Sequence, residues 1–388
     1  MRLQTGTLRP EELATLKLRG VYEQYGYKKY RMGRFEEYSL YAKNQSFLAS
    51  ENIITFTDLD GKLLALKPDV TLSIIKNSKA TRGTREKLYY IENVYRESKE
   101  SHTYKEISQM GLEVMGNVDL YSVIEVLTLA ERSLAQLSDH YLLEVSNMDF
   151  VTGLMEPMAL NDDQKQIILD LIRAKNAFEL RSEARRAGLS QRECDDLASL
   201  PTLYGKFPDT LKKAKRLVRN RTMERAVEDL EQIYHVMKSV GLAKKLQLDF
   251  SLLNDIDYYN GIIFQGYLEQ LPRNVLAGGQ YDGMVKKLGK DCGGIGFAIY
   301  LSEMSRVPLT PGDFDVEALV LYDADADLKE LTAQIQALTK QGLRVRAERS
   351  VLPQLRAERI YRWEDGALKE AASAQNGEAL AAGGKETC

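Results

Sequence analysis

The sequence predicts an α+β fold, in which strand-forming blocks are separated from one long helical block. Patterns typical of β-strands occur in residues 55–151 and again from residue 246, whereas nearly every signal between residues 152 and 241 is helical. A short strand–helix–strand pattern follows Pro311-Gly312. Segregated runs of strands and helices are typical of the α+β class.

The first block opens with a helix and continues with paired strands. Apolar residues at helical spacing from Pro10 to Tyr27 predict a helix that stops at Gly26. Asp60-Gly61 predicts a hairpin within 55–76, and the pattern becomes helical after Pro68. The rest of the block predicts strands at 87–97, 106–116 and 140–150 and an amphipathic helix at 120–137.

Composition changes divide the chain into segments. We expect a core at 1–310 with an all-helical insertion at about 152–241, a small α/β unit at 313–366, and a disordered Ala/Gly-rich tail at 367–388. Strands return in the core at 246–253 and 257–268, where Asn260-Gly261 predicts a tight turn. The stretch GGIGFAIYLSEM at 293–304 predicts a glycine-rich turn running into a helix.

Composition also restricts the function. The formal charge is −3, with 53 Lys+Arg against 56 Asp+Glu, so we expect no nucleic-acid partner. The three cysteines show no disulfide or thiolate-metal spacing and the three histidines are scattered, so we expect no metal and no cofactor. Without a signal-like segment or a run of about 18 apolar residues, we expect a cytoplasmic protein away from membranes.

Four short stretches carry candidate binding residues. LALKPDVT places Asp69 and Thr71 after the hairpin, and YRESKESHTYKEISQMGLE places Arg96 on one strand and Gln109 and Glu113 on the next. Gln109 and Glu113 share one sheet face because strand side chains alternate. NDIDYYNG at 254–261 and AGGQYDGM at 277–284 combine glycine with tyrosine. Carboxylates, arginine, amide and phenol together suit a small zwitterion with a polar side chain.

Together with GGIGFAIYLSEM, these stretches resemble the catalytic core of class II histidyl-tRNA synthetases over about residues 10–305. The resemblance implies an antiparallel sheet flanked by helices. It also implies a histidine pocket with Asp69 and Thr71 at the ammonium, Glu113 and Tyr259 at the imidazole, Tyr281 lining the ring, and Gln109 and Arg96 near the carboxylate.

Two positions depart from the synthetase pattern. The family's third motif ends in an arginine that packs on the nucleotide, and Glu303 stands at the matching position. The first histidine motif begins with an arginine that contacts the α-phosphate, and its counterpart is Asn254. Since one lost charge-stabilising donor costs about 2.7 to 4 kcal/mol of transition-state stabilisation, we expect a degenerate ATP site without useful adenylation.

This combination is similar to the family of regulatory subunits of short-form ATP phosphoribosyltransferase, which acts first in histidine biosynthesis. The resemblance implies a non-catalytic subunit that a separate catalytic subunit requires, with L-histidine as feedback effector. It also implies a homodimer within a hetero-octamer. Two alternatives remain open: a divergent active histidyl-tRNA synthetase, and a stand-alone sensor of histidine or uncharged tRNA.

Several residues have a simpler explanation. Glu113 could form an internal ion pair with Arg96 in place of a ligand contact. Tyr258 and Tyr259 are adjacent, so only one can face the pocket, and we favour Tyr259. The glycines at 293, 294 and 296 favour close backbone packing over nucleotide binding. The basic run at 212–221 keeps a helical apolar stripe, which favours a solvated helix face over an RNA-binding patch.

Overall fold

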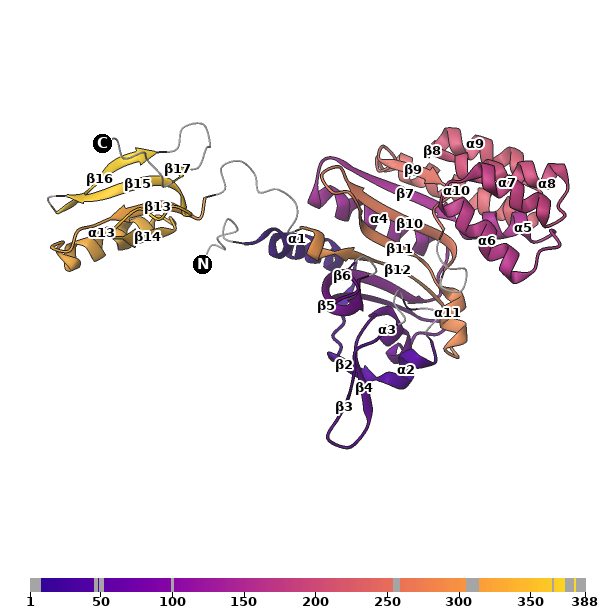
Figure 1. The fold of residues 1–388 in the computed structure, drawn as a ribbon, viewed down its shortest axis with the longest axis horizontal. Coiled ribbons are helices and arrows are strands. Elements are labelled where there is room, and N and C mark those ends of the chain that lie inside the picture. The colour runs from indigo at the N-terminus through magenta and orange to yellow at the C-terminus, as the bar shows by residue number, and fades with distance from the viewer. Residues whose placement is uncertain are drawn as a thin grey trace. The chain divides into compact units, whose positions relative to one another are not determined.

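The computed structural model describes residues 8–44, 48, 52–98, 101–253, 259–304, 314–364, 366–373 and 380–381. The chain divides into two compact units, Leu8–Val307 and Pro308–Cys388 (Figure 1). Across the described ranges, no helix is both long and apolar enough to cross a bilayer.

A nine-stranded sheet is the centre of the larger unit. Neighbouring strands are antiparallel except for the parallel pairs β1–β5 and β7–β9. With its flanking helices, this sheet confirms the predicted α+β class. Across the sheet the order is β1 (Lys28–Lys29), β5 (Arg85–Glu97), β6 (Tyr104–Gly116), β12 (Gly293–Tyr300), β11 (Asn274–Gln280), β10 (Asn260–Leu268), β7 (Tyr141–Asn147), β9 (Leu246–Asp249) and β8 (Tyr204–Lys206).

The two faces of the sheet differ in side-chain size. Along β12, Ile295, Phe297 and Ile299 lie on one face, and the alternate residues Gly294 to Ala298 lie on the other. Helix α4 (Leu120–Leu137) packs on the apolar face, and α1 (Pro10–Gln24) packs against α4. The start of α4 is fixed by Asp119, whose carboxylate accepts a hydrogen bond from the Ser122 amide at 2.9 Å. The other face is therefore left open for polar groups.

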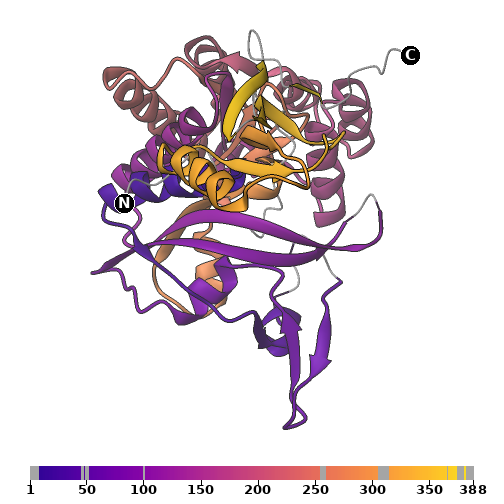
Figure 2. The same ribbon diagram turned by 90° about the vertical axis from the view of Figure 1, so that its left-hand side faces the viewer.

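A three-stranded arm precedes the central strands in the chain. Strand β4 (Leu63–Leu66) pairs with β2 (Phe35–Glu37) and β3 (Thr55–Thr57), and the helices α2 (Tyr38–Ala42) and α3 (Thr71–Asn77) follow β2 and β4. Gly61 has φ +81° between β3 and β4, which confirms the predicted hairpin. In Figure 2 this arm lies below the long β5–β6 strand pair and points away from it.

The helical insertion contains one short strand as well as helices. Helix α6 begins at the side-chain cap Asn161 and α8 at Ser190, and Gly188 and Gly241 end helical segments at φ +80° and +81°. The all-helical prediction is wrong at Tyr204–Lys206, because β8 pairs with the open edge of β9. The helices are α5 (Met148–Met155), α6 (Asp162–Arg173), α7 (Ala177–Arg186), α8 (Gln191–Ser199), the 3₁₀ turn η3 (Leu200–Thr202), α9 (Phe207–Leu217) and α10 (Arg221–Ser239).

Two glycine signals were misread from the sequence. GGIGFAIY is strand β12, and only Leu301–Met304 is helical, as α12. Asn260-Gly261 is not a turn but the start of β10, where Gly261 has φ +63° beside an irregular register with β11. The actual connection between β10 and β11 spans residues 269–273. In both cases glycine serves a sheet position, because a neighbouring side chain or an irregular backbone excludes a Cβ atom.

The smaller unit is an α/β unit with more strands than expected. Its strands are ordered β14 (Val345–Glu348), β13 (Val316–Leu321), β15 (Arg356–Glu364) and β16 (Ala367–Ser373), with β17 (Leu380–Ala381) also on β15 and helix α13 (Leu328–Lys340) after β13. The predicted disordered tail is wrong at residues 367–373. Gly366 turns at φ +76°, and Leu368 pairs with Trp363 and packs in the same apolar cluster, so β16 is held in the sheet.

Candidate functional site

The candidate site lies on the sheet face opposite α4, over a floor of glycines. Glu113 on β6 is aligned with Gly296 on β12, which is aligned with Gly279 on β11. A Cβ atom on Gly296 would lie 1.8 Å from Glu113 Oε2, and one on Gly294 would lie 2.2 Å from the Tyr281 ring. These glycines therefore provide the close packing that the sequence favoured, because larger residues would collide with the site's side chains.

Glu113 is the centre of a buried hydrogen-bond network. Its carboxylate accepts hydrogen bonds from Thr71 Oγ1 at 2.8 Å and from the Tyr281 hydroxyl at 2.5 Å. The residue is only 2% exposed. Burial raises the pKa of Glu113 to about 8, with a smaller increase from the nearby Asp69 charge, and the two hydrogen bonds oppose this increase. At neutral pH this carboxyl therefore stands close to its titration point.

Asp69 and Arg96 form a second pair beside this network. Arg96 Nη2 lies 3.5 Å from Asp69 Oδ2, and Arg96 Nε donates to the Pro68 carbonyl at 2.6 Å. Asp69 also accepts a hydrogen bond from the Leu72 amide at 2.8 Å. Burial raises the pKa of Asp69, and the positive charge of Arg96 opposes that shift. The ion-pair partner of Arg96 is therefore Asp69, and the alternative of a Glu113–Arg96 pair is wrong.

The remaining two candidates on this face are Gln109 and Tyr259. Gln109 is 3% exposed and lies on the same face of β6 as Glu113, aligned with Tyr300 of β12. Within the described residues no hydrogen bond engages its side-chain amide. Tyr259 is half-buried and packs over Gly279, where a Cβ atom would lie 2.7 Å from its ring. Tyr258 lies outside the described residues.

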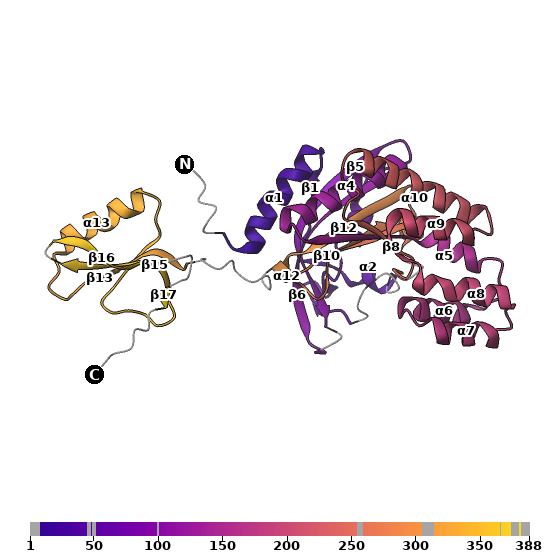
Figure 3. The same cartoon turned by 90° about the horizontal axis from the view of Figure 1, so that it is seen from above.

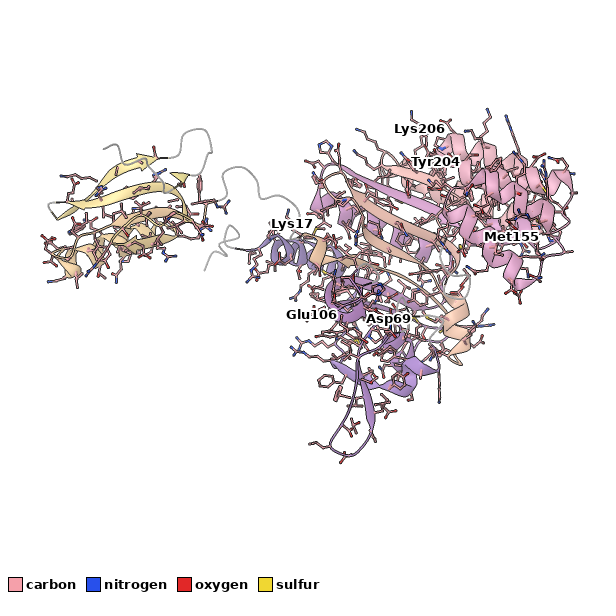
Figure 4. The ribbon with its side chains drawn as sticks, in the orientation of Figure 1. Lys17, Asp69, Glu106, Met155, Tyr204 and Lys206 are labelled. Carbon is pink, nitrogen blue, oxygen red and sulfur yellow. The ribbon has the colours of Figure 1, made fainter. Side chains whose placement is uncertain are left out.

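Of the two positions that depart from the synthetase pattern, Asn254 lies outside the described residues. Glu303 is half-buried in α12, which follows β12 and packs against β6 and α1. Asp69 lies beside α3, well separated from Met155 and Tyr204 of the helical insertion (Figure 4). The site is thus built by the sheet, α3 and the turn before α11 (Asp282–Lys287).

Two tyrosines of this region were missed from the sequence. Tyr90 on β5 is aligned with Gly111 on β6 and occupies the space that a Cβ atom there would fill. Its pKa is raised by burial and by the Glu113 and Asp69 charges. The Tyr41 hydroxyl is buried without a hydrogen-bond partner in the described structure, and the charges of Asp69 and Glu36 add to burial in raising its pKa. A large residue opposite a glycine in two aligned strands was the available signal for Tyr90.

The arrangement is suited to binding a small polar cation or zwitterion. Two buried carboxyl groups, Asp69 and Glu113, supply hydrogen-bonding oxygens, and Thr71 and Tyr281 fix the orientation of Glu113. A carboxyl poised between its two protonation states can accept from or donate to a ring nitrogen. Across the described ranges, no three His, Cys, Asp or Glu side chains gather as metal ligands would.

Comparisons with known proteins agree with this architecture. The sequence profile described as histidyl-tRNA synthetase matches residues 6–304. An ATP phosphoribosyltransferase regulatory subunit from Clostridium kluyveri is 29% identical over 337 residues, which cover 84% of this chain and 86% of that protein. Two solved structures share the fold.

The first is an ATP phosphoribosyltransferase regulatory subunit/histidyl-tRNA synthetase from Bacillus halodurans. It superimposes with a TM-score of 0.72 at 20% identity, covering 87% of this chain and 88% of the other. The second is a chain of the ATP phosphoribosyl transferase (HisG:HisZ) complex from Thermotoga maritima. It has a TM-score of 0.59 at 19% identity and covers 74% of this chain and 96% of the other.

Proposed function

Because this chain belongs to the histidyl-tRNA synthetase family, we propose that it is the regulatory subunit of an ATP phosphoribosyltransferase and binds L-histidine around Glu113. In this role it has no catalytic activity alone and acts on a separate catalytic subunit in the first step of histidine biosynthesis. The similarity to a Clostridium kluyveri protein of that name, over most of both chains, supports the assignment.

The observation that carries the proposal is the contrast between two parts of the ancestral site. The amino-acid side keeps a connected network of Thr71, Glu113 and Tyr281 beside Asp69 and Arg96. On the nucleotide side, the resemblance places Glu303 where the synthetases have an arginine, and a carboxylate repels phosphate. A pocket that binds the amino acid and no longer activates it suits a sensor of histidine.

In the proposed complex, Asp69 and Thr71 contact the histidine ammonium, and Arg96 and Gln109 contact its carboxylate. Glu113 and Tyr259 contact the imidazole, and Tyr281 lines the ring. Histidine acts by stabilising one of two conformations that the catalytic subunit distinguishes, with a coupling free energy of about 1 to 3 kcal/mol. We propose a homodimer of this chain within a hetero-octamer, since the resembled family assembles in that way.

The experiment combines this chain with the short catalytic subunit from the same organism. Phosphoribosyl-ATP formation is measured for the catalytic subunit alone, for the mixture, and for the mixture with histidine. We expect activity only in the mixture, and inhibition by histidine. The isolated chain should give no ATP–pyrophosphate exchange with histidine. Robust exchange would instead establish an active synthetase, the alternative that the matching family profile favours.

A pair of variants tests the pocket within that assay. Glu113→Gln changes the network centre, and Glu131→Gln is its matched control: Glu131 is also buried, and it also accepts a hydrogen bond from a tyrosine, Tyr141. We expect histidine inhibition to weaken at least about tenfold for Glu113→Gln, as for a buried hydrogen bond whose partner is left unpaired. It should be unchanged for Glu131→Gln. If inhibition were unchanged in both variants, the effector site would lie elsewhere in the protein. If histidine bound without any effect on the transferase, the chain would be a stand-alone sensor.

A further inference from the structure

A cavity lies at the β1 edge of the large sheet, and its lining includes no residue of the Glu113 network. It has a volume of about 490 Å³ and is lined by the start of β5, by β1 and by the residues that end α3. Strands β1 and β5 lie side by side next to α1 (Figure 3). Four of the lining residues are cationic, namely Lys28, Lys79, Arg85 and Lys87, and one is a carboxylate, Glu86.

The contacts of these residues leave two cations without a carboxylate partner. Arg85 Nη2 is paired with Asp119 at 3.1 Å, and Lys87 Nζ is paired with Glu125 at 2.7 Å. In the described parts of the chain, neither Lys28 nor Lys79 forms an ion pair. Both lysines are exposed, so their ammonium groups are accessible to an anion that enters the cavity.

The single carboxylate in the wall does not neutralise these lysines. Glu86 accepts a hydrogen bond from Ser78 Oγ at 2.6 Å and from the Lys79 backbone amide at 3.3 Å. It is thereby held against the end of α3. The neutral groups of the wall are engaged within the protein: the Asn77 amide donates to the Tyr30 hydroxyl at 3.1 Å and to the Ser73 carbonyl at 2.9 Å. The lysine ammonium groups therefore remain as donors, and ammonium groups are typical ligands of phosphate oxygens.

We propose that this cavity binds a small molecule that carries phosphate groups. The two unpaired lysines supply both the positive charge and the hydrogen-bond donors. The volume is large enough for more than a single phosphate ion. This proposal is independent of the function proposed above, because none of the lining residues belongs to the Glu113 network.

The test is isothermal titration of the full-length protein with sodium pyrophosphate and, separately, with ATP in low-salt buffer. The variants are Lys28→Gln, Lys79→Gln and their combination, and the control is Lys340→Gln, an exposed lysine of α13. We expect saturable binding by the wild type, roughly tenfold weaker binding for each single variant, and a further loss in the double variant. Binding by Lys340→Gln should equal that of the wild type.

The two ligands distinguish the source of the phosphate. Binding of pyrophosphate and ATP with similar strength indicates a site for the phosphates alone, whereas stronger binding of ATP indicates a nucleotide site; both support the proposal. Affinity should also fall as potassium chloride is added, since exposed charges are screened. The proposal is overturned if the wild type binds neither ligand saturably at millimolar concentration, or if the double variant binds as the wild type does. Circular dichroism of each variant verifies folding.

Discussion

The two faces of the nine-stranded sheet bury different chemistry. On the α4 face, residues such as Phe297 and Ile295 fill an apolar layer whose burial stabilises the fold. On the opposite face, glycines clear space for Glu113 and Tyr281, and a carboxyl is buried whose raised pKa reflects an unfavourable environment for its charge. One set of strands thus contributes to stability on one side and carries the candidate site on the other. Each face should respond differently to substitution.

The largest effect is expected on the apolar face. Phe297 is 2% exposed, and its ring lies 6.1 Å from those of both Tyr22 and Phe264. Phe297→Ala should lower the free energy of unfolding by about 3 to 5 kcal/mol because it leaves a cavity. Urea unfolding followed by circular dichroism measures this loss. Phe178→Ala, at an 89% exposed residue of α7, is the control and should change stability by less than about 0.5 kcal/mol.

A pH-dependent effect should distinguish the binding face. Between the ordinary pKa of glutamate and the value of about 8 for Glu113, the folded chain holds a proton that the unfolded chain has released. Stability therefore falls as pH rises through this window, by at most about 1.4 kcal/mol per pH unit, or ~2–3 kcal/mol over two units. The difference between the unfolding free energies of wild type and Glu113→Gln, measured from pH 5 to 8, should show this slope. If this difference in unfolding free energy did not change with pH, the pKa of Glu113 would not be raised in the folded chain.

Adding one methyl group to the glycine floor should cost less. Gly296→Ala places a Cβ atom 1.8 Å from Glu113 Oε2 and 2.3 Å from the Leu112 carbonyl, so strand and side chain must shift. We expect a loss of about 1 to 3 kcal/mol in unfolding free energy. Gly20→Ala is the matched control in α1, where nothing lies within 4 Å, and it should raise stability by roughly 0.5–1 kcal/mol. Similar changes in both would show that the floor is not close-packed.

The smallest effect on stability compares two tyrosine–glutamate hydrogen bonds. Tyr281→Phe removes the bond to Glu113, and Tyr141→Phe removes the bond to Glu131. Each should lower the free energy of unfolding by about 1 kcal/mol. Only Tyr281→Phe should also weaken histidine binding, measured by calorimetric titration. Equal histidine affinity in the two variants would mean that the Tyr281 hydroxyl does not contribute to histidine binding.

Strand pairs and helices with strong periodicity were predictable from the sequence. The helix at 120–137 has the predicted bounds, and Asp60-Gly61 gave the hairpin, because each depends on local signals. GGIGFAIY was misread because glycine marks both turns and crowded sheet positions. The alternation of Ile295, Phe297 and Ile299 with small residues was present, however, and indicates a strand with one bulky face.

The candidate site was predictable only in part. Alternation placed Gln109 and Glu113 on one face, but the contacts of Glu113 with Thr71 and Tyr281 join residues 42 and 168 positions apart. No local pattern specifies such contacts, and the resemblance to a known family supplied those residues. The Asp69–Arg96 ion pair was missed because its geometry depends on how the chain turns at Pro68. The strand at 367–373 depended likewise on tertiary pairing with β15.

Helix α3 has only seven residues, from Thr71 at the Glu113 carboxylate to Asn77 at the basic cavity. At 1.5 Å per residue it is about 10 Å long, too short to bend. A displacement of its first turn would therefore also move its last turn. One short helix thus links the Glu113 network to the cavity at the β1 edge.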